Sequence, residues 1–118
     1  MEEEIHSLLS SLGHPVAWGS LGSGTSLPRV VLSKVSGSER VTLDGPVGKI
    51  VARVQIDCYG DALREAGQLG YAIRGLLSGY AGGVITFARL EGIRDGRDGS
   101  DGDAIPRMSL DFAVHYRV

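Results

Sequence analysis

The sequence has a single cysteine, Cys58, among its 118 residues. No disulfide can therefore form within the chain, and a zinc site built on several thiolates is disfavoured. Cys58 falls on the apolar side of a predicted strand, and no nearby residue favours its thiolate. It is therefore interpreted as a buried structural thiol rather than a reactive nucleophile.

The sequence also lacks any apolar run long enough to cross a bilayer. Its first residues, MEEEIHSLLSS, are acidic and have neither the basic region nor the apolar core of a signal peptide. We therefore expect folding in a cytoplasm. The formal net charge of −2 argues against a dedicated nucleic-acid-binding protein, although passive contact with DNA stays open. The length is typical of one domain over residues 1–118.

The clearest pattern in the chain runs from Lys49 to Tyr80. Apolar and polar residues alternate between Ile50 and Tyr59, which predicts a strand with one apolar face. After Gly60 the period changes to that of an amphipathic helix, whose apolar stripe can cover a sheet. Asp61 is the predicted N-cap. The helical stripe comprises Ala62, Ala66, Leu69, Ile73, Leu76, Leu77 and Tyr80, and the residues expected to end the helix are Gly79, Gly82 and Gly83.

The first third of the chain predicts a short helix, an irregular loop and a strand. Glu2 to Leu12 has the spacing of a short helix, and its glutamates suit the positive end of the helix dipole. Residues 16–28 are rich in Gly and Ser and are expected to be irregular. Trp18 in this loop is either a hydrophobic anchor or a contact for a partner. Leu27 to Val35 is β-branched and predicts a strand, in which Pro28 indicates either an edge position or a start just after it.

Two further strands are predicted near the C-terminus. Val84 to Leu90 forms one of them, with Ile85 and Phe87 on the same face. The last strand alternates regularly from Met108 to Val118. Together these segments predict an α+β fold: a mostly antiparallel four-stranded sheet, one long helix packed on one face and a short N-terminal helix.

Two long connections are expected to project from this domain, at about residues 36–48 and 94–106. The first, SGSERVTLDGPVG, is interpreted as a projecting arm or hairpin in which Arg40 to Leu43 is briefly extended. The second contains RDGRDGSDGD, which is interpreted as a solvated hairpin loop. A calcium site is the weaker alternative, because the EF-hand spacing is absent and two arginines would compete with a cation. Its candidate ligands are Asp95, Asp98, Asp101 and Asp103.

No convincing catalytic group emerges. The segment GSLGSGTS lacks the lysine and the strand-to-helix context of a phosphate-binding loop. Asp57, Asp111 and His115 could meet across neighbouring strands, but any polar sheet face produces such encounters. No cofactor is predicted. Since a helix covers the other face of the sheet, the polar face is interpreted as meeting solvent or a polar protein interface through Arg53, Gln55, Arg107 and Arg117.

The order of these segments resembles a known family. The chain resembles the small tail-completion or tail-terminator proteins of long-tailed bacteriophages, which also occur in prophages and gene transfer agents. The shared order is a strand, a long loop, a strand ending in RVQIDCYG, a helix, a strand, an acidic loop and the final strand MSLDFAVHYRV. The resemblance covers most of the chain from Leu27 onward and depends on pattern and element order rather than on a catalytic motif.

The resemblance implies a structural virion protein and no enzyme. Such proteins form rings, generally hexameric, that cap the head-proximal end of the tail tube, stop tube polymerisation and join the tail to the head, after assembly in the host cytoplasm. The implied partners are other copies of the chain, the major tail tube protein, a head connector or neck protein, and DNA that passes through the lumen. The candidate interface residues are Arg40, Leu43, Asp44, Arg53, Gln55, Arg107 and Arg117.

Two other interpretations stay open from the sequence. One is another neck component, such as a head-closure or adaptor protein. The other is a small ligand- or metal-binding α+β domain.

Overall fold

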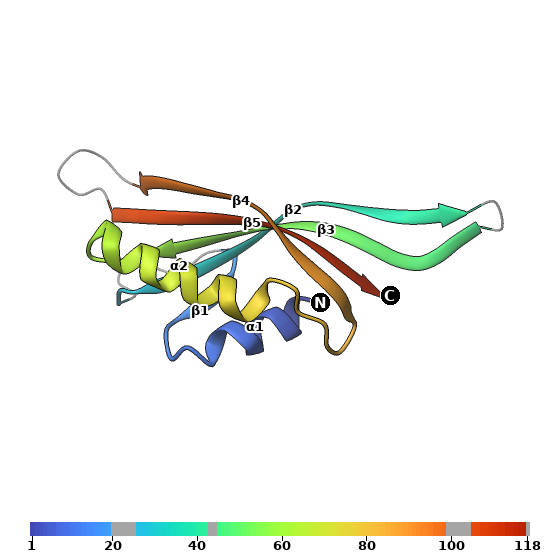
Figure 1. Ribbon diagram of the computed structural model, residues 1–118, viewed down its shortest axis with the longest axis horizontal. Coiled ribbons are helices and arrows are strands. Elements are labelled where there is room, and N and C mark those ends of the chain that lie inside the picture. The colour runs from blue at the N-terminus through green and yellow to red at the C-terminus, as the bar shows by residue number, and fades with distance from the viewer. Residues whose placement is uncertain (20–25, 43–44, 99–104, 118) are drawn as a thin grey trace.

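The computed structural model describes residues 1–19, 26–42, 45–98 and 105–117, and shows an α+β fold (Figure 1). The described elements follow the chain in the order α1 (Glu2–Ser10), β1 (Val16–Trp18), β2 (Arg29–Thr42), β3 (Gly45–Tyr59), α2 (Leu63–Leu77), β4 (Ile85–Asp98) and β5 (Ile105–Arg117). The sheet order is β1-β2-β3-β5-β4. Only the β1–β2 pairing is parallel, so the sheet is mixed and has five strands.

The prediction of a four-stranded antiparallel sheet was wrong because β1 lies in the segment expected to be irregular. Val16 to Trp18 pairs with Val30 to Leu32 of β2. Two further backbone hydrogen bonds extend the pairing, from the Gly19 N–H to the Leu32 carbonyl and from the Val30 N–H to the Pro15 carbonyl. A strand of three residues is too short to show an alternating pattern, and it forms because β2 supplies its hydrogen-bonding partner.

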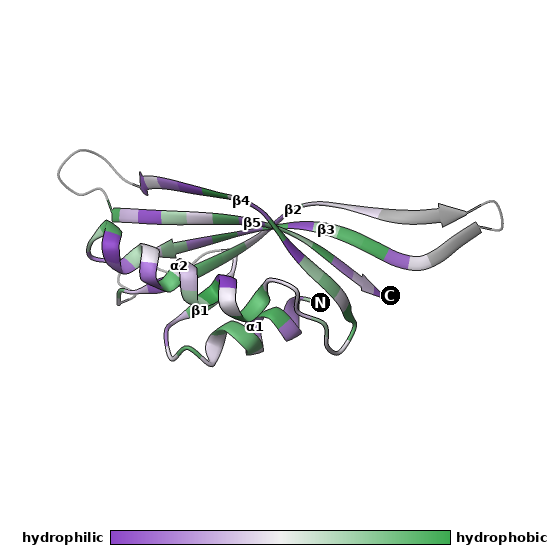
Figure 2. Ribbon diagram, viewed as in Figure 1, coloured by the Kyte–Doolittle hydropathy of each residue, from purple (hydrophilic) through white to green (hydrophobic). Residues whose placement is uncertain are grey.

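The centre of the sheet is the β3–β5 pair, and the alternation predicted for both strands is confirmed. Its register runs from Lys49↔Arg117 to Tyr59↔Arg107 without a bulge. Apolar rows from the two strands therefore lie side by side under the helices. The fully buried members of these rows are Ala52, Val54, Ile56, Cys58, Leu110, Phe112 and Val114. Figure 2 shows the corresponding alternation of hydrophobic and hydrophilic residues along the strands.

Both helices cover the same face of the sheet (Figure 1). From α1, Ile5 and Leu9 are fully buried, and from α2 Ala66, Ile73 and Leu77 are fully buried. The predicted N-terminal helix and the predicted stripe of the long helix are thus confirmed in outline. In the described residues, no helix is long and apolar enough to cross a membrane.

The two ends of α2 differ in how well the sequence predicted them. Asp61 is not the N-cap, because the helix begins one residue later, with Ala62 as N-cap and no side-chain capping bond. Instead the Asp61 N–H donates to Oε1 of Glu65 at 2.8 Å, so the carboxylate inside the first turn binds the preceding backbone. At the other end, Gly79 has φ +79°, the left-handed geometry that glycine adopts readily after a helix.

The face assignment of β4 was wrong. Ile85 and Phe87 were expected on one face, but a register shift between them places them on opposite faces. Ile85 is 2% exposed in the core, whereas Phe87 is 45% exposed. A β-bulge inserts one extra residue and so reverses the alternation beyond it. A second register shift lies between Leu90 and Gly92.

Two hairpins extend the sheet at opposite ends (Figure 1). Strand β2 continues to Thr42, which pairs with Gly45, so the predicted projecting arm is a hairpin. The pairing of β3 with β5 stops at Lys49, and the residues nearer the tip have only each other as strand partners among those described. At the other end β4 continues to Asp98, opposite Ile105. The connection predicted at residues 94–106 therefore lies partly in strands, since residues 94–98 belong to β4 and residues 105–106 to β5.

Two glycines of α2 provide a test of how tightly the helix packs on the sheet. A Cβ atom at Gly70 would lie 2.8 Å from Sδ of Met108, whereas a Cβ atom at Gly75 would have nothing within 4 Å. Gly75→Ala should raise the free energy of unfolding by about 0.5–1 kcal/mol through helix propensity. Gly70→Ala should lower it by about 1–3 kcal/mol through overpacking.

Urea unfolding of both variants measures this difference. Equal effects of the two substitutions would contradict the close contact between α2 and β5.

Candidate functional site: the open face of the sheet

The face of the sheet opposite the helices is called here the open face. The strand register places on it every second residue of β3 and β5, with their neighbours on β2 and β4. From β3 and β5 these residues are Lys49, Val51, Arg53, Gln55, Asp57, Tyr59, Arg107, Ser109, Asp111, Ala113, His115 and Arg117.

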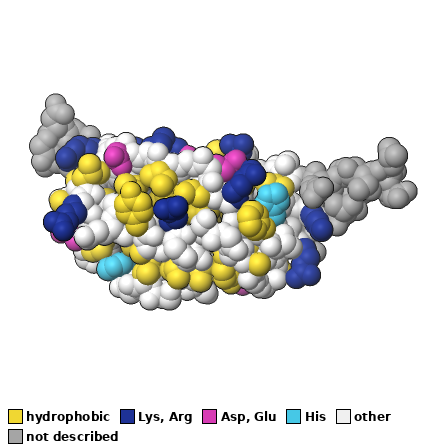
Figure 3. Space-filling view, in the orientation of Figure 1, with side chains coloured by type: hydrophobic (Ala, Val, Ile, Leu, Met, Phe, Trp, Pro, Cys, Tyr) yellow, Lys and Arg dark blue, Asp and Glu magenta, His cyan; other side chains and the backbone are white. Residues whose placement is uncertain are grey.

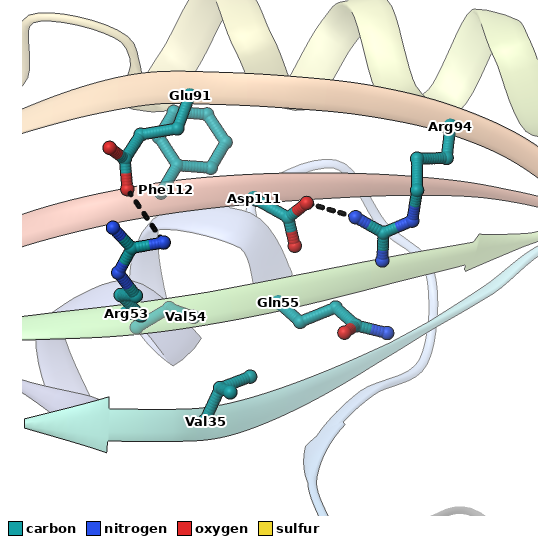
Figure 4. Close-up of a pocket in the computed structure, with 8 residues that line it drawn as sticks. All are labelled: Val35, Arg53, Val54, Gln55, Glu91, Arg94, Asp111 and Phe112. Atoms are coloured by element: carbon teal, nitrogen blue, oxygen red, sulfur yellow. Dashed lines mark hydrogen bonds and ion pairs between the residues drawn. The ribbon is translucent and has the colours of Figure 1, made fainter.

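Ion pairs occupy the centre of the open face. Glu91 lies 3.8 Å from Arg53 and 3.4 Å from Arg89, and Arg94 pairs with Asp111. Figure 4 shows Arg53 of β3 reaching across β5 toward Glu91 of β4, and Arg94 of β4 reaching toward Asp111 of the neighbouring β5. They line a groove of about 290 Å³ together with Val35, Val54, Gln55 and Phe112. The groove is small and its charges are already paired, so it is better suited to holding the strands in register than to binding a ligand.

Next to this groove lies a buried polar group. Asp57 is 8% exposed and Ser109, its partner on β5, is 1% exposed. The Ser109 hydroxyl donates to Oδ1 of Asp57 at 2.6 Å, and Nε2 of Gln55 donates to the two carboxylate oxygens at 3.0 and 3.2 Å. Hydrogen bonds of this kind offset the cost of removing a carboxylate from water.

Basic side chains lie at both ends of the open face. At one end the register aligns Arg29, Tyr59 and Arg107 across three strands. The Arg29 guanidinium lies 5.3 Å from the centre of the Tyr59 ring, a cation–π contact. At the other end Lys49 pairs with Arg117, whose Nη2 donates to the Gly83 carbonyl at 3.1 Å.

The acid–base group considered from the sequence is divided among separate contacts. Asp57 binds Ser109 and Gln55, and Asp111 pairs with Arg94. The His115 ring lies 6.2 Å from the Phe87 ring. In the described part of the chain, no hydrogen bond joins Asp57, Asp111 or His115 to another of the three. These contacts give no proton-transfer path among them.

The candidate interface residues fall into two places. Arg53, Gln55, Arg107 and Arg117 all lie on the open face, as the alternation predicted. Arg40 lies in the β2–β3 hairpin, while Leu43 and Asp44 lie outside the described residues. Their role as interface residues stays a prediction.

The calcium hypothesis is tested only in part. Asp95 and Asp98 lie in β4, but Asp101 and Asp103, like most of GSLGSGTS, lie outside the described residues. Within the described ranges, no group of three or more metal-binding side chains converges.

Cys58 and Trp18 are structural. Burial, with a smaller contribution from the Asp57 charge, raises the pKa of the Cys58 thiol to about 12, so it is a poor nucleophile. Trp18 lies in β1 and packs against the core, and its Nε1–H donates to the Glu2 carbonyl at 3.1 Å. It therefore ties β1 to α1, as the anchor interpretation predicted.

Sequence reasoning missed part of the open face. Arg89, Glu91 and Arg94 were not recognised, because two bulges in β4 interrupt its alternation and Arg94 was assigned to a loop. The pairing of Arg29 with Tyr59 gave no local signal, since these residues are thirty positions apart and meet only through strand pairing.

Comparison with known proteins identifies the family. The family described as Tail completion protein gp17 matches residues 4–117. The chain belongs to this family. Its membership confirms the resemblance found in the sequence and supports a structural protein of the phage tail rather than an enzyme.

The fold also matches a solved structure. A chain of the "Virion of native gene transfer agent (GTA) particle" superposes with a TM-score of 0.66 at 17% sequence identity, over 95% of this chain and 86% of that chain. At this identity the match establishes the shared fold. A comparison with curated protein sequences gave no match.

Removing the Ser109 hydroxyl tests the buried carboxylate of the tail completion protein. Ser109→Ala leaves the Asp57 carboxylate without its shortest hydrogen bond, and should lower the free energy of unfolding by about 1.5–3 kcal/mol at pH 7. Ser36→Ala is the control, since Ser36 is exposed on the same sheet and should change stability by less than about 0.5 kcal/mol. Urea unfolding measures both, and similar small effects would show that the buried hydrogen bond contributes little.

Proposed function

We propose that this protein caps the head-proximal end of the phage tail tube, stops its polymerisation and joins the tail to the head as a ring. The observation that carries the proposal is the family match across nearly the whole chain. Tail completion requires a surface that ends one assembly and begins another. A small domain can do this through protein contacts alone, without catalysis.

The geometry of the fold supports this proposal. The helices bury one face of the sheet, and the other face carries mostly charged and polar side chains. The β2–β3 hairpin extends beyond the helix-covered part of the sheet, and the β4–β5 hairpin lies at the opposite end, beside α2 (Figure 1). A subunit of this shape presents several distinct surfaces, as a ring member must: two for its neighbours, one for the tube and one for the neck.

A closed ring of identical subunits uses heterologous contacts, in which two different surfaces of the chain meet. The proposed ring is a hexamer at the head-proximal end of the virion tail, assembled in the host cytoplasm. Its partners are the neighbouring copies, the major tail tube protein and a head connector or neck protein, and DNA crosses its lumen.

The β2–β3 hairpin is proposed to contact the tail tube or the neighbouring subunit. Beyond Lys49 it is a two-stranded ribbon, and such a ribbon is marginally stable alone in water. We therefore assign the ribbon to contacts between proteins rather than to the stability of the single domain.

Electron microscopy of particles produced without this gene tests the capping role. We expect overlong tubes together with unattached, filled heads, because tube subunits would continue to add at an end that is not capped. Complementation with the wild-type gene is the control.

Tails of normal length lying apart from full heads would move the protein to a head-closure or adaptor position in the neck. Intact and infectious particles would refute both structural roles and reopen the ligand- or metal-binding interpretation.

Shortening the β2–β3 hairpin tests its proposed contact. Replacing residues 40–48 with a short glycine-containing turn removes the ribbon but keeps the Lys49↔Arg117 pair and the core. The variant should fold with little change in melting temperature, yet fail to restore capped tails to particles that lack the gene.

A matched control is available at the other end of the sheet, where residues 99–104 can be replaced by Asn-Gly. Normal tails with the shortened β2–β3 hairpin would exclude the hairpin as an assembly contact.

A further inference from the structure

The sheet has two outer edges, and part of each edge is already covered. On β4 the Gly79 N–H donates to the Ala88 carbonyl at 2.8 Å and Gly82 pairs with Ile85, so the turn after α2 covers the beginning of the strand. On β2 the short strand β1 covers residues 30–32. Among the described residues, the stretches that keep an edge without a strand partner are residues 90–98 of β4 and residues 33–42 of β2.

The ladder identifies the main-chain groups of β4 that point outward. The Gly60 N–H donates to the Pro106 carbonyl at 3.2 Å, so this carbonyl points to the β3 side of β5. Direction alternates from residue to residue in an antiparallel ladder, so Met108 also points to that side. Their partners on β4, Arg97 and Asp95, therefore direct their N–H and C=O groups away from β5. This edge offers its donors and acceptors to another strand.

The free edge of β2 is built in the same way. The Val30 N–H donates to the Pro15 carbonyl, and the Leu32 carbonyl accepts from the Gly19 N–H, so both residues of β2 point toward β1. Lys34 is next in this alternation, but the pairing of β1 with β2 has ended before it. The second edge of the sheet thus begins at an exposed lysine.

An exposed apolar strip borders the free edge of β4. One flank of α2 lines a pocket with Leu12 and Pro28, so the opposite flank lies toward β5 and β4. Leu63 and Tyr71 are on that opposite flank, and Ile93 lies on the same side of the sheet. In the described part of the chain, these are three of the five exposed large hydrophobic residues. Figure 3 shows hydrophobic side chains gathered in the region between α2 and β4 of Figure 1.

We propose that the free edge of β4 pairs with the free edge of β2 in a neighbouring copy of the chain, through an antiparallel ladder of main-chain hydrogen bonds. The pairing depends on the proposed ring, whose contact between subunits it supplies. Because the three pairings that connect β2 to β4 are all antiparallel, the two strands run in opposite directions. A rotation about an axis along the strands keeps these directions, so β4 meets the next β2 antiparallel.

Charge favours this partner. Lys34 and Asp95 are exposed, have opposite charges, and lie on the helix-covered side of their strands. Cross-strand pairs of opposite charge stabilise strand pairing. A strand of the neighbouring copy that brings its Lys34 opposite Asp95 also lies beside Ile93, and so covers one side of the apolar strip.

The position of the two free stretches agrees with a closed arrangement. Across the sheet, Lys34 is aligned with Phe112 of β5. Asp95 pairs with Met108, four residues away along β5. Bringing the two charges together therefore shifts the neighbouring copy by about 13 Å along the strands. Closed sheets have such a stagger between strands, because their strands tilt relative to the axis.

A second β4 edge is the competing occupant. An antiparallel β4–β4 contact centred on Arg94 or on Asp95 would place two like charges opposite each other, which is destabilising. Such a contact is isologous and ends at a dimer, whereas a ring needs two different surfaces. It would also leave the edge of β2 without a partner.

Carbodiimide treatment of purified wild-type tails tests the pairing, since this reagent joins an amine to a carboxylate in direct contact. Within one copy β2 and β4 are three strand spacings apart, about 14 Å, so a link between Lys34 and Asp95 must join two copies. We expect mass spectrometry to find this link and a denaturing gel to show a ladder that continues beyond the dimer.

The other lysine of the chain, Lys49, is an internal reference. It is exposed on the open face and should form no link to Asp95. A gel that stops at the dimer, or tails in which Lys34 and Asp95 are not joined, would overturn the inference.

A proline at position 95 tests the main-chain contact. Because the Asp95 N–H points away from β5, Asp95→Pro removes no hydrogen bond of the β4–β5 ladder but blocks a strand added at this edge. The variant should fold, which circular dichroism and melting temperature verify, yet fail to restore capped tails to particles that lack the gene. Asp95→Asn keeps the N–H and is the matched control, which should restore them.

The outcomes separate this inference from the proposed function. Capped tails with Asp95→Pro would refute the edge pairing and leave the capping role intact. Loss of capping with both variants would show that the carboxylate matters instead of the main chain, which also refutes strand pairing. If Asp95→Pro does not fold, the carbodiimide result on the wild type decides. Normal tails in particles without the gene would instead refute the proposed function.

Discussion

The uninterrupted pairing of β3 with β5 is the constraint on which the rest of this structure depends. Eleven residue pairs follow one another without a bulge, so a single register determines which side chains lie under the helices and which lie on the open face. A slip of one residue would exchange the two sets and place charged residues in the core. Burial of the apolar row against α1 and α2 makes such a slip very unfavourable, and so also determines the position of every charge on the open face.

The outer strands show how that constraint weakens away from the centre. Both β2 and β4 contain two register shifts, and the β2–β3 hairpin extends beyond the helices. Bulges increase twist and turn side chains toward a new direction. In β4 they bring Phe87 out of the core and allow Glu91 to meet two arginines. The bulges of β2 and β4 thus change which side chains reach the surface, whereas the regular β3–β5 pair maintains the fold.

The family assignment and the physical description agree on the kind of protein this is. A tail completion protein acts through its surfaces, and the polar groups at the centre of this chain make contacts within the chain. Asp57 is held by Ser109 and Gln55, Cys58 is buried with a raised pKa, and the central charges pair across strands. Each of these groups is engaged by its neighbours instead of being prepared for chemistry.

The sequence by itself determined the elements whose patterns are long and regular. The alternation of β3 and β5, the stripe of α2 and the short α1 were all predicted, because each repeats a local preference over many residues. Tertiary structure alone decided the rest. Strand β1 exists because β2 pairs with it, and the orientation of Phe87 depends on a bulge that no local pattern reveals. The arginines of the open face come from distant segments of the chain, and only strand pairing places them on one side of the sheet.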